Sequence, residues 1–263
     1  MTNDRFNYLL LGDRQKPIAL FLHGFMGSCE DFKEIASLLE ENFCCLLIDL
    51  PGHGNTEVDR DACYQMSEVA RGIIELLTQL AIEQCFLVGY SMGGRLALYL
   101  AIHFPRYFAK VVLESASPGL ETQAARDIRN EQDLKLVNKL ETTDFSLFLH
   151  QWYSKPLFTS FKAHPHYDRA IALRLNNDPQ QLAKSLRYMG LGRQPCLWQN
   201  LETNRIPLLL IVGELDRKFV AIAQRVAYLS ISSRLEIVEN TGHNVHFEHP
   251  VFFAGLLNNF WQD

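Results

Sequence analysis

The sequence predicts an α/β fold, with a mostly parallel central sheet flanked by helices and an inserted helical cap. Short apolar runs alternate with helical patterns in the first half of the chain and again near its end. The runs are apolar at consecutive positions, which is typical of strands that a parallel sheet buries on both faces. Between residues 119 and 203 the alternation stops, and helical patterns continue without a clear strand.

In the first half, each element follows from a local signal. Ser28 has an acid three residues later, which predicts the start of a helix. A helix is also predicted where apolar residues recur at helical spacing from Val69 to Leu80. We expect strands at 17–22, 43–49, 85–90 and 110–115, and helices at 28–41, 66–81 and 93–103.

After residue 203 the alternation resumes, with strands expected at 207–212 and 235–239, a helix at 220–229 and a last helix after Pro250. Because both flanks of the helical block must complete one sheet, we predict a core of residues 1–118 and 204–263 and a cap of residues 119–203. The cap has a net charge of +2 and the rest of the chain −7, which weakly favours an anionic substrate.

Composition argues against several classes of protein. The net charge of −5 and the lack of a nucleic-acid motif argue against a nucleic-acid partner. No apolar run approaches the roughly 20 residues that span a bilayer, and the first residues do not resemble a signal peptide, so we expect a cytoplasmic protein. None of the six cysteines forms a CxxC pair. We expect no disulfide, no metal site and no cofactor.

The most informative motif is Gly89-Tyr90-Ser91-Met92-Gly93, a G-x-S-x-G pattern between a predicted strand and a predicted helix. In that context the serine lies on a sharp, strained turn, and its hydroxyl points out at the end of the sheet. A glycine-rich helix start with a capping serine is the alternative. The predicted strand before Ser91 and the helix after it favour a nucleophile or base.

A serine hydroxyl needs a base and an acid to orient that base. His243 follows the predicted strand at 235–239, and Asp216 follows the one at 207–212. Glu214 is a rival acid, and Asp216 could instead be a helix N-cap. The order Ser91, Asp216, His243 is the order that the α/β-hydrolase fold uses. We therefore predict these three residues as a catalytic triad.

Backbone N–H groups of Phe25 and Met92 are the predicted oxyanion hole, because in this fold the first strand–helix loop and the residue after the nucleophile donate them. We interpret Asp49 and His53 as structural residues of a turn. Arg95 lies one turn into the nucleophile helix, where a cation opposes the helix dipole. A bound carboxylate would compensate it, and pairing with a protein acid is the alternative.

Taken together, these segments resemble the 2-succinyl-6-hydroxy-2,4-cyclohexadiene-1-carboxylate synthase family, lyases of menaquinone and phylloquinone biosynthesis. Many hydrolases share much of the serine motif. Arg95, the Lys-Phe pair after Asp216 and the string Gly-His-Asn-Val-His-Phe-Glu are more particular. The segments that carry the resemblance are 21–27, 49–54, 89–95, 213–219 and 242–248 in the core, and 119–129, 152–158 and 174–177 in the cap.

The resemblance implies a substrate with three carboxylates. It implies that Arg95, Arg126 and Arg174 hold the anionic groups and that Tyr90 and Trp152 shape the pocket. Without it, the cap arginines would be interpreted as solvated helix faces. Arg129 could replace Arg126, since it stands one turn further along the same predicted helix.

The resemblance further implies elimination of pyruvate from 2-succinyl-5-enolpyruvyl-6-hydroxy-3-cyclohexene-1-carboxylate, with Ser91 as the general base and no cofactor. The partner is then a small tricarboxylate. One alternative is a serine hydrolase of small carboxyl esters or thioesters, which would form an acyl-serine. A second is a binding protein without catalytic activity on the same fold, although such a protein has little reason to keep all three triad residues.

Overall fold

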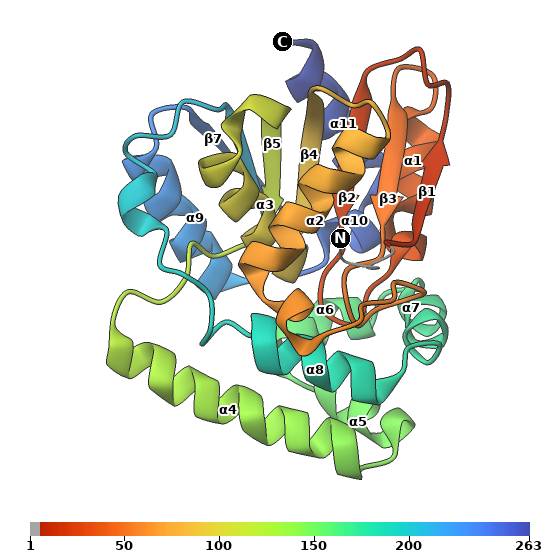
Figure 1. Ribbon diagram of the computed structural model, residues 1–263, viewed down its shortest axis with the longest axis vertical. Helices are drawn as coiled ribbons and strands as arrows, with labels where there is room; N and C mark the ends of the chain where they lie inside the picture. The colour runs from red at the N-terminus through yellow and green to blue at the C-terminus, as the bar shows by residue number, and fades with distance from the viewer. Residues whose placement is uncertain (1–5) are drawn as a thin grey trace.

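A seven-stranded sheet forms the centre of the molecule, in the order β1-β3-β2-β4-β5-β6-β7 (Figure 1). The structure is a computed structural model, and it describes residues 6–263. Only β1 runs antiparallel to its neighbour, and every other pair is parallel. The strands are β1 (Tyr8–Leu11), β2 (Ile18–Leu22), β3 (Cys44–Ile48), β4 (Cys85–Tyr90), β5 (Phe108–Glu114), β6 (Leu208–Gly213) and β7 (Ser233–Val238).

The predicted α/β fold is thus confirmed, and six of the seven strands match predicted runs. The sequence analysis missed β1, a four-residue edge strand that is only partly buried. The helix predicted at 28–41 is a 3-10 helix, Cys29–Phe32, followed by α1 (Lys33–Leu39). Ser28 does cap it, because its hydroxyl accepts a hydrogen bond from the Glu30 N–H.

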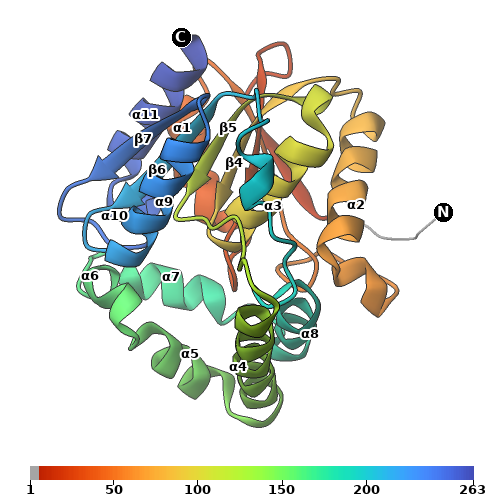
Figure 2. The ribbon, with the colours of Figure 1, turned by 90° about the vertical axis from the view of Figure 1, so that its left-hand side faces the viewer.

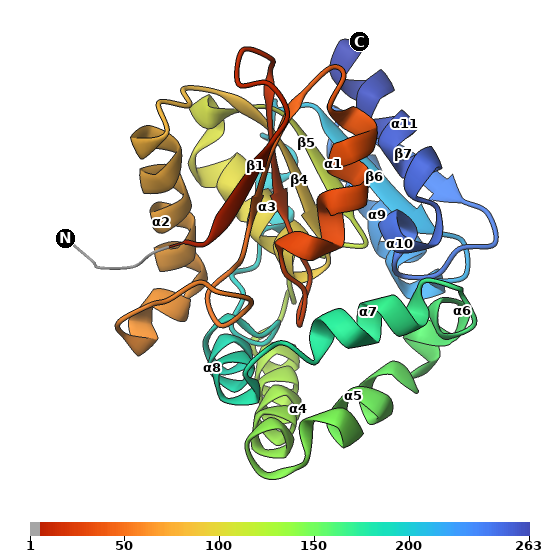
Figure 3. The same ribbon diagram turned by 90° about the vertical axis from the view of Figure 1, so that its right-hand side faces the viewer.

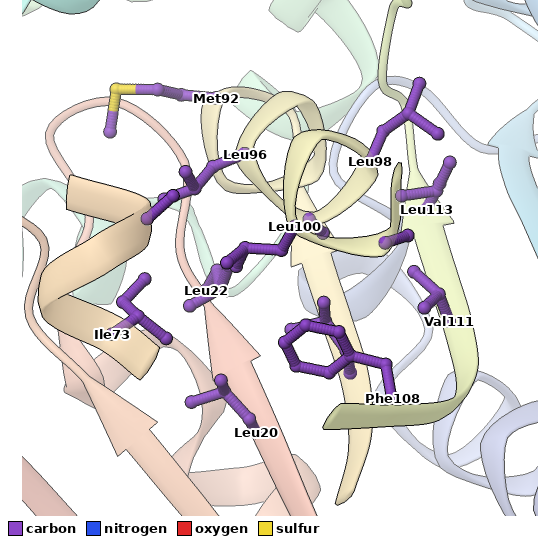
Figure 4. Packing of buried hydrophobic residues seen from close by; sticks show 14 of the residues in the cluster. Leu20, Leu22, Ile73, Met92, Leu96, Leu98, Leu100, Phe108, Val111 and Leu113 are labelled. Carbon is purple, nitrogen blue, oxygen red and sulfur yellow. The ribbon is translucent and has the colours of Figure 1, made fainter. Parts of the chain in front are cut away.

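Helices cover both faces of the sheet, as Figures 2 and 3 show from opposite sides. Residues of α2, α3 and α9 pack with one face of the sheet, and residues of α1, α10 and α11 pack with the other. Figure 4 shows Leu96 and Leu100 of α3 beside Leu22 of β2, at the centre of the first layer. The bounds are α2 (Met66–Gln79), α3 (Met92–His103), α9 (Arg217–Leu229), α10 (Val245–Glu248) and α11 (Pro250–Gln262).

The chain between β5 and β6 is described throughout and contains helices but no strand. These helices lie together beyond one end of the sheet (Figures 1 and 3). Their apolar side chains form a third buried cluster, which Met26 and Phe247 of the core join. The cap helices are α4 (Gln123–Thr142), α5 (Phe145–Tyr153), α6 (Thr159–Lys162), α7 (Tyr167–Arg174) and α8 (Pro179–Met189).

Short 3-10 helices connect several of these elements, namely Asp61–Tyr64, Pro105–Tyr107, Pro156–Phe158 and Trp198–Asn200. Within residues 6–263, no helix combines the length and the apolar character that crossing a bilayer requires.

Candidate active site

Ser91 occupies the sharp turn between β4 and α3. Its φ of 49° and ψ of −103° lie outside the regions that L-residues favour. The turn is held from outside, because the Ser91 N–H donates to the Glu114 carbonyl of β5 at 2.8 Å. It also requires glycines: a Cβ at Gly89 would overlap the Gly93 carbonyl. The motif therefore fixes the backbone that presents the serine hydroxyl.

We expect Gly93→Ala to lower the free energy of unfolding by about 1–3 kcal/mol, as overpacking does in well-packed interiors. A Cβ there would overlap the carbonyl oxygens of Leu22 and His23, both of which belong to the rigid sheet end. Urea unfolding measures the change. Gly255→Ala is the control: nothing lies within 4 Å of its added Cβ on α11, so it should stabilise slightly. Equal effects for the two variants would contradict this account of the turn.

The structure brings the three predicted triad residues into one series of hydrogen bonds. His243 Nε2 lies 3.1 Å from Ser91 Oγ, and His243 Nδ1 lies 2.6 Å from Asp216 Oδ2. Asp216 is also the N-cap of α9, since its Oδ1 accepts from the Phe219 N–H. Glu214, the rival acid, instead accepts from the Asn240 N–H. Asp216 therefore caps α9 and also bonds to His243, and the capping bond helps to orient its carboxylate.

The two predicted oxyanion donors are the backbone N–H groups of Phe25, which comes before Ser91 in the chain, and of Met92, which comes directly after it. Met92 is the first residue of α3, where a backbone N–H has no intrahelical acceptor. Phe25 follows β2 and lines the same cavity as Ser91 and Met92. Among the hydrogen bonds of residues 6–263, neither N–H has a protein acceptor. Both groups are therefore available to a ligand oxygen.

Asp49 and His53 organise the loop beside Phe25. The Asp49 carboxylate accepts from the N–H groups of Cys29 and Asn55 at 2.7 and 2.9 Å. The His53 Nδ1 lies 3.2 Å from the Pro51 carbonyl, and the ring contacts Phe25 edge-on. Neither side chain is among those that line the cavity, which agrees with the structural interpretation.

A cavity of about 340 Å³ lies between the triad and the cap, within the range of small-molecule sites. Tyr90 and Trp152 line it, as predicted. Tyr90 is fixed by its hydroxyl, which donates to Asn244 Oδ1 at 2.6 Å. Positive charge predominates in the lining: the basic side chains are Arg95, Arg129, Lys155, Arg174 and Lys218, and Asp133 is the acidic one.

Arg95 enters this cavity without a carboxylate partner among residues 6–263. Its guanidinium donates to Gln194 Oε1 and to the Met189 carbonyl, each at 3.2 Å. Burial, and then the nearby charge of Arg129, lower the pKa of Arg95 to about 10. The alternative of pairing with a protein acid therefore does not describe this site. A partly buried cation with no ion pair among residues 6–263, in the cavity that Ser91 also lines, favours an anionic ligand.

The structure places the other two predicted arginines differently. Arg126 does not line the cavity: it turns back toward the start of α4 and donates to the Leu120 carbonyl at 2.8 Å. Arg129 lines the cavity in its stead, with Asp133 as its partner at 2.7 Å. For the position on α4, the geometry therefore favours the alternative, Arg129. One turn of helix separates the two positions, and the sequence pattern does not distinguish them.

Arg174 lines the cavity but is already paired. Two of its nitrogens donate to the Asp31 carboxylate at 2.5 and 2.9 Å, and its Nε donates to the Tyr153 hydroxyl. Both partners of the ion pair are almost fully buried. This bidentate pair joins α7 of the cap to the 3-10 helix after β2. Any contact of Arg174 with a substrate would therefore come in addition to a structural role.

Two features of the site have no counterpart in the sequence analysis. The first is Lys155, which lines the cavity within the Trp152–Phe158 segment. The second is a fully buried pair behind the serine, in which His246 Nδ1 lies 2.8 Å from Glu114 Oε2. Glu114 ends β5, and His246 follows His243 by three residues. The pair therefore links the strand that holds the Ser91 backbone to the loop that carries His243.

Comparisons with known proteins agree with this fold. A family model described as "alpha/beta hydrolase fold" matches residues 17–250. The chain is 34% identical to "2-succinyl-6-hydroxy-2,4-cyclohexadiene-1-carboxylate synthase" of Serratia proteamaculans, over 95% of this chain and 94% of that protein. The "Structure of MenH from S. aureus" superposes with a TM-score of 0.92 at 30% identity, covering 98% of this chain and 97% of that one.

A plant protein is similar over a small part of its length. The chain is 35% identical to "Protein PHYLLO, chloroplastic" of Arabidopsis thaliana, and the match covers 92% of this chain but 15% of that protein.

Proposed function

This chain belongs to the 2-succinyl-6-hydroxy-2,4-cyclohexadiene-1-carboxylate synthase family of the α/β-hydrolase fold, and we propose that it has the corresponding lyase activity. It would release pyruvate from 2-succinyl-5-enolpyruvyl-6-hydroxy-3-cyclohexene-1-carboxylate, a step of menaquinone or phylloquinone biosynthesis. The observation that carries the proposal is Arg95, a cation without an acidic partner in the described chain, in the cavity that Ser91 and His243 line. A tricarboxylate suits such a cavity better than an apolar ester does.

In the proposed reaction, His243 takes the Ser91 proton, and Asp216 stabilises the imidazolium that forms. The Ser91 alkoxide then removes the ring proton next to the succinyl ketone, and the electron pair moves onto the ketone oxygen. The N–H groups of Phe25 and Met92 hold that negative charge. When the enolate collapses, the C–O bond to the enolpyruvyl group breaks, and the leaving enolpyruvate takes up the proton of the His243 imidazolium and becomes pyruvate, which restores the neutral imidazole. No covalent bond to the protein forms.

The charged lining supports this assignment of roles. Arg95 and Arg129 would bind substrate carboxylates, and Arg129 takes the place first given to Arg126. Stabilisation raises the turnover rate only where it is stronger in the transition state. We assign Arg95 to binding of a substrate carboxylate in both the ground state and the transition state, one helical turn from Ser91, so its loss should appear mainly in KM.

A serine hydrolase of carboxyl esters or thioesters would use the same three residues. The two reactions differ in a testable way, since a hydrolase forms an acyl-serine and the lyase does not. The test of the proposal is pyruvate release by the purified protein, after subtraction of the uncatalysed rate. Release well above that rate supports the lyase. A rate no faster than the blank, together with turnover of an ester or thioester panel, would overturn it.

We expect Arg95→Met to raise KM about 10- to 150-fold, with a smaller change in kcat. This range corresponds to the loss of one charge-assisted hydrogen bond to a carboxylate. Steady-state kinetics of pyruvate release measures it. Arg126→Met is the matched control on the cap, because Arg126 bonds to neighbouring residues of its own segment and should leave KM within about two-fold. The opposite ranking of the two variants would restore Arg126 as the binding residue.

A further inference from the structure

Lys155 occupies an unusual position in the cap. It follows α5, and its Nζ lies 3.5 Å from the centroid of the Trp152 ring. The side chain is partly buried and lines the cavity that Ser91 and Arg95 also line. Trp152 in turn contacts Phe25, whose N–H is a proposed oxyanion donor. The cation–π contact therefore holds an ammonium group inside the cavity.

The charges around Lys155 are mainly positive. Arg129 and Lys139 face it from α4, together with one acid, Asp133. That acid is already engaged, since it pairs with Arg129 at 2.7 Å and accepts from the Gly192 N–H. In the described part of the chain, Lys155 forms no ion pair of its own. Arg129 and Lys155 thus both line the cavity, and the acid near them, Asp133, pairs with Arg129.

Burial, followed by the charges of Arg129 and Lys139, lowers the pKa of Lys155 to about 8. Like charges and desolvation both oppose the ammonium form of Lys155. An anion bound between Arg129 and Lys155 would reverse both effects. The apolar neighbours Leu136 and Leu157 also line this part of the cavity and would keep water away from the pair.

We propose that Lys155 and Arg129 form a second carboxylate subsite, carried entirely by the cap and separate from the Arg95 position on the core. The inference rests on the proposed function for the identity of the substrate, which has more than one carboxylate to place. It assigns Arg95 and the Lys155–Arg129 pair to different carboxylates of one molecule. Lys155 is then a specificity-determining residue that selects substrates with at least two carboxylates.

The test uses stable aromatic probes and measures binding by calorimetry, so that it does not depend on turnover. The dicarboxylate is 2-(3-carboxypropanoyl)benzoate. Two monocarboxylates each lack one of its acids: 4-oxo-4-phenylbutanoate lacks the ring acid, and 2-butanoylbenzoate lacks the chain acid. Lys155→Gln should weaken the dicarboxylate about ten-fold and Lys155→Arg much less. Lys162→Gln, an exposed lysine in α6 of the same cap, is the matched control and should change nothing.

The monocarboxylates show whether the effect belongs to one acid. Lys155→Gln should weaken the monocarboxylate that keeps the acid bound at the subsite and leave the other within about two-fold. Equal weakening of all three probes would overturn the proposal, because it indicates a general loss of shape or charge. Unchanged affinity for all three would overturn it as well.

Affinity for the dicarboxylate should also depend on pH, because Lys155 loses its charge as pH rises. Only its ammonium form attracts a carboxylate, so affinity for the dicarboxylate should fall as pH rises through about 8 and beyond. Arg95 titrates at higher pH, because its pKa is lowered only to about 10. In Lys155→Gln the slope should disappear. A slope that persists in this variant would assign the titration to another group and contradict the subsite.

Failure of this proposal and failure of the proposed function give different results. A wild-type protein that binds the dicarboxylate through Lys155 but releases no pyruvate would keep the subsite and reject the lyase. If the protein releases pyruvate but Lys155→Gln binds the dicarboxylate as tightly as wild type, the lyase assignment is kept and the subsite is rejected.

Discussion

Replacing Ser91 by alanine is expected to reduce kcat for pyruvate release about 10³- to 10⁶-fold, the range found when a member of a serine triad is removed. The reason is that Ser91 Oγ is the atom that takes the substrate proton, and His243 Nε2 lies 3.1 Å from it. Binding of the aromatic dicarboxylate should stay within a few-fold of wild type, since the cationic side chains are untouched. Steady-state kinetics and calorimetry measure the two quantities.

Variants of His243 and of an exposed serine test whether the loss of turnover is specific to the triad. His243→Ala should be nearly as damaging as Ser91→Ala, and the double variant hardly worse than either, because the residues act as a unit. Ser154→Ala, at an exposed cap position, should behave like wild type. If Ser91→Ala kept more than about a tenth of the turnover, another group would be the base and the proposed mechanism would fail.

Asp31→Ala is expected to lower the free energy of unfolding by about 3–5 kcal/mol, the cost of leaving one partner of a buried ion pair uncompensated. Arg174 would keep its charge in a site where its side chain is 2% exposed, with the Tyr153 hydroxyl as its remaining hydrogen-bond partner within residues 6–263. Urea unfolding of the whole chain measures the change. Activity should fall too, because this pair joins the cap to the core.

The chain offers a matched control for that prediction. A second ion pair of α7 joins Arg169 to Glu34, in the first turn of the next helix, α1, at 3.2 Å. Both side chains are exposed, so Glu34→Ala should cost less than about 1 kcal/mol. If both variants had the same small effect, the Arg174–Asp31 pair would not hold the cap. Arg174 would then be free for the substrate-binding role that the sequence resemblance implies.

Local signals explain why much of the fold was predictable. Strands β3, β4 and β6 of the central sheet are buried on both faces, so their sequences are apolar at consecutive positions and differ clearly from those of the helices. The G-x-S-x-G turn is also partly local, because Gly89 avoids an overlap with Gly93 inside the motif itself. Asp216 and His243 follow strands β6 and β7, and the topology of a parallel sheet brings such loops to one edge.

Other features depend on contacts between distant segments, which a periodic pattern does not reveal. Arg174 meets Asp31 across 143 residues of sequence. The choice between Arg126 and Arg129 depends on how α4 is rotated above the cavity. The Glu114–His246 pair joins the end of β5 to α10, 132 residues later, and no local sequence signal beside either residue predicts it. Lys155 belongs to the same class, since its burial depends on the packing of α4 against the segment after α5.

The central claim is that Ser91 acts as a base and not as a nucleophile. The most direct measurement follows pyruvate and the intact mass of the protein in one reaction mixture during the first turnovers on 2-succinyl-5-enolpyruvyl-6-hydroxy-3-cyclohexene-1-carboxylate. The account predicts rapid pyruvate release while the protein mass stays unchanged, and both signals should be flat in Ser91→Ala. A mass increase on the wild-type protein that is absent in Ser91→Ala would contradict it and identify an acyl-serine.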